Sequence, residues 1–324
     1  MSMPILSAHS LVKHFNAGGF GAARKVVRAV DDVSFELAPG ETLGVVGESG
    51  CGKSTTARLL VQLLTPDSGS VRYEGKMVGP ELPLKSFRSK VQMVFQDSFA
   101  SLNPRMTMID AVAFGPMVHG VSRAEAMRKA QDLLDRVGLD PTRFGGRYAH
   151  ELSGGQRQRV NIARALAFDP RVIVLDEAVS ALDKSVEAQV LNLLMDLRRE
   201  RGLTYVFISH DLNVVRHISD RVMVMYLGEV AEIGPAESLY SAPRHPYTEA
   251  LLAAMPSLDP DRRTMEAPLA GDPPNPIDPP PGCRFHTRCA HAFGPCSAQV
   301  PVSHRVGTGH VAACHLNAKT KEVA

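Results

Sequence analysis

Short apolar runs alternate with longer amphipathic stretches over about the first 240 residues of the chain. This alternation predicts the strands and helices of an α/β domain. Polar or glycine-rich residues follow each apolar run, and an open parallel sheet binds its ligands at such positions. The expected buried strands are residues 42–46, 91–95, 172–175 and 205–208, with a further strand at 222–226.

The segment between the second and third of these runs has a different amino-acid composition. Residues 98–149 are rich in Ala, Glu, Arg and Leu, and Ser122 precedes Glu125 by three positions, as in a capping box that opens a helix. We therefore expect a mostly helical subdomain, at about residues 98–157, inserted into the sheet domain.

The last quarter of the chain departs from the α/β pattern. Residues 256–281 contain nine prolines, which disfavour both a helix and a central strand. We therefore expect an extended linker at 256–282, between a main domain at 1–255 and a small cysteine-bearing C-terminal module at 283–324.

Composition and charge exclude some classes of protein. The chain has 324 residues, is 44% hydrophobic and 22% charged, and carries a formal net charge of +2. These values are typical of an ordinary globular protein and give no electrostatic reason to expect a nucleic-acid partner. The opening residues do not form a signal peptide, and no stretch approaches the roughly 20 apolar residues that span a bilayer. We expect a soluble cytoplasmic protein that docks on a membrane protein.

Residues 47–54 read GESGCGKS and match the phosphate-binding pattern G-x-x-x-x-G-K-[ST]. An apolar strand precedes the loop and a helical run follows it, which is the context that this motif requires. Backbone N–H groups would bind phosphate oxygens, Lys53 would reach the β- and γ-phosphates, and Ser54 would ligate Mg²⁺. The small Cys51 side chain needs no chemistry of its own. The expected nucleotide-binding residues are Gly47, Glu48, Ser49, Gly50, Cys51, Gly52, Lys53, Ser54 and Thr55.

Polar side chains at the ends of the other expected strands complete this site. Asp176 ends an apolar strand and is the expected Mg²⁺ ligand, and Glu177 would orient or deprotonate the attacking water. Gln96 and His210 follow two further strands and would meet the γ-phosphate, with Gln96 also near the metal. A solvated acidic pair and two ordinary loop residues are the simpler alternatives. The expected catalytic set is Glu177, His210, Lys53 and Gln96.

A further motif is not part of a generic phosphate-binding loop. Residues 152–156 read LSGGQ and residues 180–183 read SALD. With the motifs above, in this order over about residues 5–240, they resemble the ABC ATPase family. The resemblance implies a P-loop fold with a mainly parallel sheet core, an antiparallel N-terminal β part and an inserted helical subdomain. It also implies that Ser153, Gly154, Gly155, Gln156 and Asp183 serve a nucleotide shared with a second ATPase subunit.

The same family stacks an aromatic ring on adenine from a loop upstream of the P-loop. Phe15 resembles that residue, although the glycine-rich residues 18–21 blur the alignment and Phe20 is a rival. A core or surface role is the alternative for Phe15. ATP and Mg²⁺ are the cofactors that the resemblance implies.

Residues 95–105, 245–248 and 279–283 look specifically like the ATPases of peptide and nickel importers, in particular the second, F-type ATPase of dipeptide and oligopeptide permeases. This implies a paralogous ATPase partner, two membrane-spanning permease subunits and, indirectly, a periplasmic substrate-binding protein, at the cytoplasmic face of a bacterial inner membrane. Phe99, Leu102 and Met106 would contact a permease helix, or pack in the core instead. A nickel chelate, glutathione or an opine is an alternative cargo. A soluble non-transport ATPase and a module that traps ATP without turnover are alternative functions.

Four cysteines gather near the end of the chain, at Cys283, Cys289, Cys296 and Cys314. In a reducing cytosol such a cluster favours a metal site over disulfides. The spacing lacks a C-x-x-C pair, so it indicates neither a zinc knuckle nor a ferredoxin run. The family resemblance adds a 4Fe–4S cluster. A zinc site that uses His286, His291 or His315, and no metal at all, remain open.

Overall fold

The computed structural model describes residues 3–17, 25–255 and 271–319. Phe20 and residues 256–270 of the predicted linker lie outside this part of the chain. Residues 271–282 form bends and turns without a helix or strand, as their prolines predict. Among the described helices, none combines the length and the apolar character that crossing a bilayer requires.

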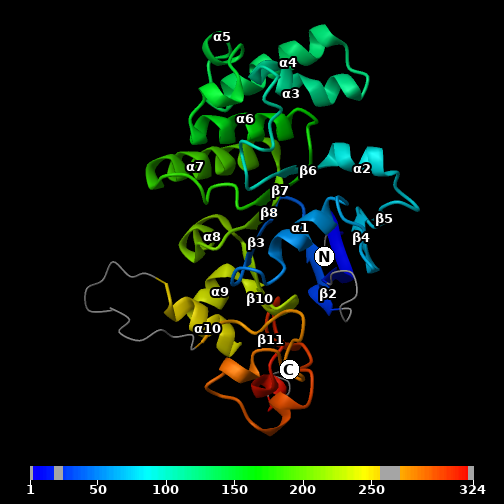
Figure 1. Ribbon diagram of the computed structural model, residues 1–324, viewed down its shortest axis with the longest axis vertical. Coiled ribbons are helices and arrows are strands. Elements are labelled where there is room, and N and C mark those ends of the chain that lie inside the picture. Colours follow the sequence, from blue (N-terminus) through cyan, green and yellow to red (C-terminus); the bar gives the residue numbers. More distant parts are fainter. Residues whose placement is uncertain (1–2, 18–24, 256–270, 320–324) are drawn as a thin grey trace.

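A large mixed sheet forms the centre of the molecule (Figure 1). Its strands are β3 (Thr42–Val46), β6 (Val91–Val94), β7 (Val172–Asp176), β8 (Thr204–Ile208), β9 (Arg221–Tyr226), β10 (Glu229–Pro235), β11 (His304–Gly307) and β12 (His310–Ala312). They lie in the order β11-β12-β10-β9-β3-β8-β7-β6, and β9, β3, β8, β7 and β6 are parallel. Every residue of β3, β7 and β8 is buried, because parallel strands are covered on both faces. The predicted parallel core is confirmed.

A second, antiparallel sheet lies beside the central one. It contains β1 (Leu6–Ala17), β2 (Lys25–Leu37), β4 (Ser68–Tyr73) and β5 (Lys76–Met77), in the order β2-β1-β4-β5. Its inward residues share a hydrophobic core with α1 (Lys53–Leu60) and with Phe87 of α2 (Leu84–Lys90). This sheet is the expected antiparallel N-terminal part, and it places β2 next to the N-terminus of α1.

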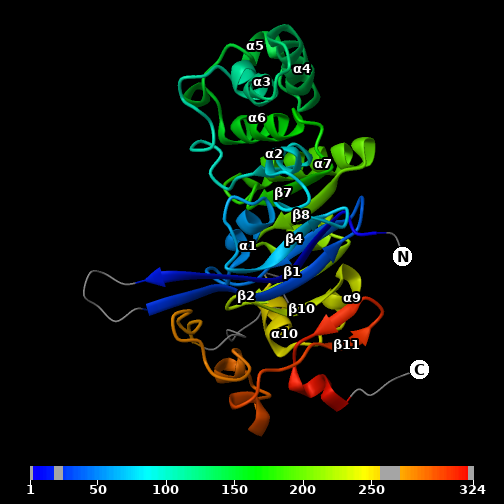
Figure 2. The same ribbon diagram turned by 90° about the vertical axis from the view of Figure 1, so that its right-hand side faces the viewer.

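The inserted helices form an arm at one end of the molecule (Figures 1 and 2). They are α3 (Met108–Val118), α4 (Arg123–Arg136), α5 (Pro141–Phe144), η1 (Ala149–Glu151) and α6 (Gly154–Leu166). Ser122 caps α4 as predicted, since its Oγ accepts a hydrogen bond from the backbone N–H of Glu125 at 3.3 Å. The first helix of the arm begins at Met108, so residues 98–107 form the loop that leads into it.

The C-terminal part is joined to the central sheet. Strand β12 pairs antiparallel with β10, and β11 pairs with β12, so this hairpin extends the sheet of the main domain. The buried Glu232 of β10 accepts hydrogen bonds from His310 Nε2 at 2.6 Å and from the N–H of His245 at 3.0 Å. The remaining elements are α7 (Lys184–Arg201), α8 (Leu212–Ile218), α9 (Ala236–Ser241), α10 (Pro246–Ala253), η3 (His286–Arg288), η4 (Gly294–Ser297) and η5 (His315–Lys319).

Candidate functional site

The glycine-rich loop between β3 and α1 adopts a backbone conformation that its glycines permit. Gly47 and Gly52 have φ angles of +147° and +106°. A Cβ atom on Gly47 would lie 2.2 Å from the carbonyl oxygen of Met225, and one on Gly52 would lie 2.2 Å from that of Ala29. Neither contact is tolerable, because both opposing atoms belong to the backbone. The loop therefore packs against β9 and β2 through positions that exclude any side chain.

Lys53, at the start of α1, points back over this loop. Its ammonium group donates hydrogen bonds to the carbonyl oxygens of Gly47 at 2.7 Å and Glu48 at 2.9 Å. The side chain is buried, so these carbonyls replace the water that the charge would otherwise bind. A phosphate held by the loop would offer the ammonium group a stronger, charged acceptor.

Ser54 and Asp176 meet at the carboxyl end of β7. The Ser54 hydroxyl donates a hydrogen bond to Asp176 Oδ1 at 2.9 Å. Asp176 is only 3% exposed, and burial raises the pKa of its carboxyl, while the hydrogen bond from Ser54 opposes that change. A hydroxyl and a buried carboxylate that lacks a full counter-charge are the hard oxygen ligands that Mg²⁺ takes. The residues present therefore fit that ion.

Glu177 adopts a left-handed backbone conformation, with φ of +47°, directly after Asp176. Non-glycine residues in this region are strained and concentrate at functional sites. The conformation turns the carboxylate toward two side chains from other strands. Gln96 Nε2 donates a hydrogen bond to Glu177 Oε2 at 2.9 Å, and His210 Nδ1 lies 3.5 Å from the same oxygen. Three of the four predicted catalytic side chains thus converge from the ends of β6, β7 and β8.

These groups open onto one cavity of about 370 Å³. It brings together most of the predicted loop residues with Gln96, Glu177 and His210. Its lining residues are Val27, Ala29, Ser49, Gly50, Gly52, Lys53, Ser54, Thr55, Gln96, Glu177 and His210. Gly47, Glu48, Cys51 and Asp176 are not among these lining residues, and Cys51 is buried.

Three residues at this site have no counterpart among the residues expected from the sequence. Val27 and Ala29 of β2 form one wall of the cavity. The Tyr247 hydroxyl accepts a hydrogen bond from the N–H of Glu48 at 2.9 Å and so supports the loop from behind. In the sequence, residues 245–248 stand out only through the family resemblance. A tyrosine near the end of the domain carries no local signal of contact with the loop.

Phe15 lies near the cavity without lining it. It is 38% exposed, and it pairs across the antiparallel ladder with Val27, which does line the cavity. The Lys13 ammonium lies 5.8 Å from the centroid of its ring. Phe15 therefore stays a prediction for adenine stacking.

The LSGGQ residues lie at the N-terminus of α6, as expected. Ser153 Oγ accepts a hydrogen bond from the N–H of Gln156 at 3.3 Å, and Gln156 Oε1 accepts one from the N–H of Ser153 at 2.9 Å. This is a complete capping box. Asp183 caps the adjacent α7 by accepting from the N–H of Val186 at 3.1 Å. None of residues 153–156 is among those that line the chain's own cavity.

The three apolar residues expected to contact a permease differ in exposure. Leu102 is buried in the core and Met106 is partly buried against it, so core packing is the role that the structure supports for these two. Phe99 is 45% exposed, and the guanidinium carbon of Arg157 lies 5.5 Å from the centroid of its ring. Only Phe99 of the three presents a large part of its side chain to the surface.

The expected 4Fe–4S cluster on Cys283, Cys289, Cys296 and Cys314 is not supported. Within the described residues, no three His, Cys, Asp or Glu side chains form a group that would hold a metal ion. The alternative zinc site is therefore not supported either. His286 and His315 place a ring nitrogen 2.8 Å and 2.9 Å from backbone carbonyl oxygens.

Burial also affects the pKa of these thiols in the chain without a metal. It raises the pKa of Cys283 to about 11, and it also raises the pKa of Cys289 and of Cys314. A neutral, buried thiol packs as a small apolar group. The cysteines are free thiols, and two of the four are buried.

Fold and cavity together define a P-loop nucleotide-binding domain. A family model described as "ABC transporter" matches residues 30–180, and one described as "Oligopeptide/dipeptide transporter, C-terminal region" matches residues 231–296. The chain belongs to the ABC transporter family, as an ATPase subunit with the oligopeptide/dipeptide-type C-terminal region.

Individual relatives agree with this assignment. The chain is 51% identical to a probable peptide ABC transporter ATP-binding protein of Sinorhizobium fredii, over 98% of this chain and 91% of that protein. It is 48% identical to the dipeptide transport ATP-binding protein DppF of Escherichia coli, over 97% and 95% of the two chains. A solved ATP-binding cassette, a dimer in a post-hydrolysis state bound to ADP and Pi, is similar with a TM-score of 0.62 and 29% identity, over 71% of this chain and 98% of that one.

Proposed function

We propose that this chain hydrolyses ATP to drive the import of dipeptides or oligopeptides through a membrane transporter. One observation carries the catalytic part of the proposal: Gln96, Glu177 and His210 line the same cavity as the phosphate-binding loop. The names of the relatives and the oligopeptide-type C-terminal region support the peptide cargo over a nickel chelate, glutathione or an opine.

The roles of the residues follow from their places in the cavity. The N–H groups of the loop and the Lys53 ammonium would bind the phosphates. Glu177 would accept a hydrogen bond from the attacking water and take its proton, and Gln96 and His210 would hold the Glu177 carboxylate in place. Ser54, Asp176 and Gln96 would hold Mg²⁺, which when bound neutralises phosphate charge.

A second ATPase subunit would complete the site. Residues 153–156 present backbone N–H groups at the N-terminus of α6. The N-terminus of a helix favours the binding of a phosphate. Because they do not line the chain's own cavity, they would serve the nucleotide on the partner, and the partner's equivalent would close over this one. Asp183, beside them at the start of α7, would lie at the same interface.

The permease subunits would dock on the helical arm. Phe99, in the loop that leads into the arm, is 45% exposed, and Phe114 and Val118 of α3 are 53% and 61% exposed. Large exposed apolar side chains are available for contact with a partner protein. Docking there would place the chain at the cytoplasmic face of a bacterial inner membrane, with a periplasmic binding protein supplying the peptide.

Uptake of a radiolabelled dipeptide tests this function. A strain whose copy of this chain carries Lys53→Ala should lose uptake, whereas the wild-type copy restores it. A labelled nickel chelate in the same strains is the control for cargo. Unchanged dipeptide uptake with Lys53→Ala would contradict the proposal, and loss of nickel uptake alone would change the cargo.

A further inference from the structure

Glu48 belongs to the phosphate-binding loop, but it is not among the residues that line the nucleotide cavity. Its carboxylate is bound by Arg288, which lies 240 residues further along the chain. Arg288 Nη1 donates to Glu48 Oε2 at 2.7 Å, and Nη2 donates to Glu48 Oε1 at 3.1 Å. The Arg288 side chain is only 6% exposed. A two-point arginine–carboxylate pair in such surroundings fixes both position and orientation.

The Arg288 guanidinium is itself held in place. Nη2 also donates to the carbonyl oxygen of Gly271 at 3.0 Å, and Nη1 lies 3.5 Å from the Tyr226 hydroxyl. The rings of Tyr226 and Tyr247 pack with centroids 4.5 Å apart, and Phe285 contacts both at 5.3 Å. An aromatic cluster and the C-terminal chain therefore support the ion pair from the side opposite the nucleotide.

The main chain of Glu48 connects this pair to the phosphate-binding groups. Its N–H donates to the Tyr247 hydroxyl at 2.9 Å, and its carbonyl oxygen accepts from Lys53 Nζ at 2.9 Å. Ser49 and Gly50, the next two residues, line the cavity. A change in the position of Glu48 would therefore move both the loop and the resting position of Lys53.

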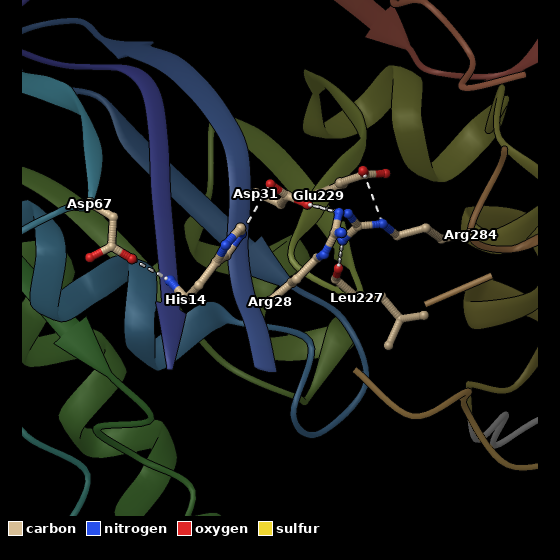
Figure 3. A network of polar contacts seen from close by, with 7 residues as sticks. All are labelled: His14, Arg28, Asp31, Asp67, Leu227, Glu229 and Arg284. Carbon is tan, nitrogen blue, oxygen red and sulfur yellow. Dashed lines mark hydrogen bonds and ion pairs between the residues drawn. The ribbon is translucent and has the colours of Figure 1, made fainter. Parts of the chain in front are cut away.

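A second contact of the same C-terminal region reaches the other wall of the cavity. Arg284 donates to the carbonyl oxygen of Leu227 and to Asp31 of β2, and its Nε lies 3.0 Å from Glu229 Oε1 (Figure 3). Burial alone would raise the pKa of Asp31, but hydrogen bonding and charge from Arg284 lower it.

The backbone of β2 also contacts the C-terminal region. The N–H of Arg28 donates to the carbonyl oxygen of Pro276 at 3.2 Å. Arg28 lies between Val27 and Ala29, which line the cavity. The C-terminal region thus contacts β2 between the two residues of the cavity wall, at Arg28, and shortly after them, at Asp31.

We propose that residues 271–288 position the nucleotide site, with Arg288 as a positioning residue for the phosphate-binding loop and Arg284 for the β2 wall. The inference rests on the proposed binding of ATP in this cavity. Neither arginine lines the cavity. They would act by keeping the loop and β2 in the arrangement that binds ATP. The apparent affinity for ATP is proportional to the fraction of molecules in that arrangement, so it falls when the fraction falls.

Binding of Mg·ATP to the full-length chain, measured by calorimetry together with steady-state ATPase kinetics, tests the proposal. Arg288→Ala should raise both Kd and KM for ATP roughly fivefold or more, in the range of coupling between separate sites. The value of kcat should change less than about twofold, because Gln96, Glu177 and His210 make no contact with Arg288 or Glu48 that the change would remove. Arg288→Lys keeps the charge without the two-point geometry, so it should give an intermediate Kd. Arg305→Ala, an exposed arginine on β11, is the matched control and should bind as the wild type does.

Glu48→Gln provides a second variant in case Arg288→Ala does not fold. It preserves the shape of the side chain and weakens only the ion pair, so Kd for ATP should rise in the same direction. In the double variant Arg288→Lys with Glu48→Gln, the loss should be smaller than the product of the two single losses. Wild-type Kd and KM in either single variant would overturn the inference. Absence of ATP binding by the wild-type chain would instead overturn the proposed function.

Discussion

Gln96 Nε2 and Glu177 Oε2 lie 2.9 Å apart although 81 residues separate them in the chain. The contact joins the ends of β6 and β7 at the mouth of the cavity, and His210 at the end of β8 approaches the same carboxylate oxygen. Glu177 is therefore the point at which the groups expected to sense the γ-phosphate meet. Its carboxylate should control turnover without controlling binding.

Replacing Glu177 by Gln should preserve binding of Mg·ATP and abolish turnover. The amide keeps the size of the side chain but does not accept a proton, so kcat should fall by about 10²-fold or more. Calorimetry and a phosphate-release assay check the two halves of the prediction. Glu237→Gln, an exposed position on α9, is the control. Normal turnover by Glu177→Gln would assign the water-orienting role to another residue.

Asp176→Asn should remove both a pH-dependent loss of stability and the stabilisation of the chain by Mg·ATP. Burial raises the pKa of the Asp176 carboxyl above its usual value of 3.8. In the wild-type chain without ligand, the buried charge therefore lowers the free energy of unfolding at a pH above the raised pKa. This loss of stability disappears below pH 3.8, where the carboxyl is protonated in both the folded and the unfolded chain. The free variant should therefore melt no lower than the wild type at pH 7. Mg·ATP at 100 times Kd should stabilise the wild type by about 2.7 kcal/mol. Thermal unfolding with and without Mg·ATP measures both effects, and a full Mg·ATP response in the variant would refute the assignment.

Gly52→Ala should destabilise the chain more than Gly50→Ala. Both positions have positive φ, so each alanine would introduce backbone strain of about 1–3 kcal/mol. At Gly52 the new Cβ would also lie 2.2 Å from the carbonyl oxygen of Ala29, whereas nothing lies within 4 Å of a Cβ at Gly50. The clash should add about 1–3 kcal/mol, as overpacking does. Chemical denaturation of the two variants compares them, and equal losses would show that the loop relaxes.

His245→Asn should reduce the sensitivity of the fold to acid. Burial lowers the pKa of His245 from 6.5 to about 4, against the opposing charge of Glu232. Between these two values the unfolded chain takes up a proton that the folded chain does not, so stability is lost as the pH falls, at no more than about 1.4 kcal/mol per pH unit.

Asparagine is the suitable replacement because the His245 ring caps α10 by accepting from the N–H of Tyr247. An Asn side chain caps a helix in the same way without titrating. Denaturation midpoints at pH 7, 5.5 and 4.5 should fall more steeply for the wild type. Parallel curves for the two proteins would place the acid-sensitive group elsewhere.

Local patterns in the sequence determine much of this protein. The loop at 47–54, the acidic end of β7 and the capped start of α6 depend on backbone geometry within a few residues, and flanking strand and helix periodicity was enough to place them. The parallel core and the helical arm follow from the same periodicities, and the strand boundaries agree closely. The sequence predicts the arm at about 98–157, but its first helix begins at Met108 and its last ends at Leu166, because helix ends are weakly encoded.

The tertiary structure alone decides the contacts between segments that are distant in the chain. Packing buries Leu102 and exposes Phe99, although both are apolar residues of one short stretch. It also sets the cysteines in an arrangement that holds no metal among the described residues, and it brings Arg288 onto Glu48 across 240 residues. Spacing along the chain does not encode these outcomes, because they depend on how the central sheet orders its strands and on which side chains then fill the space between them.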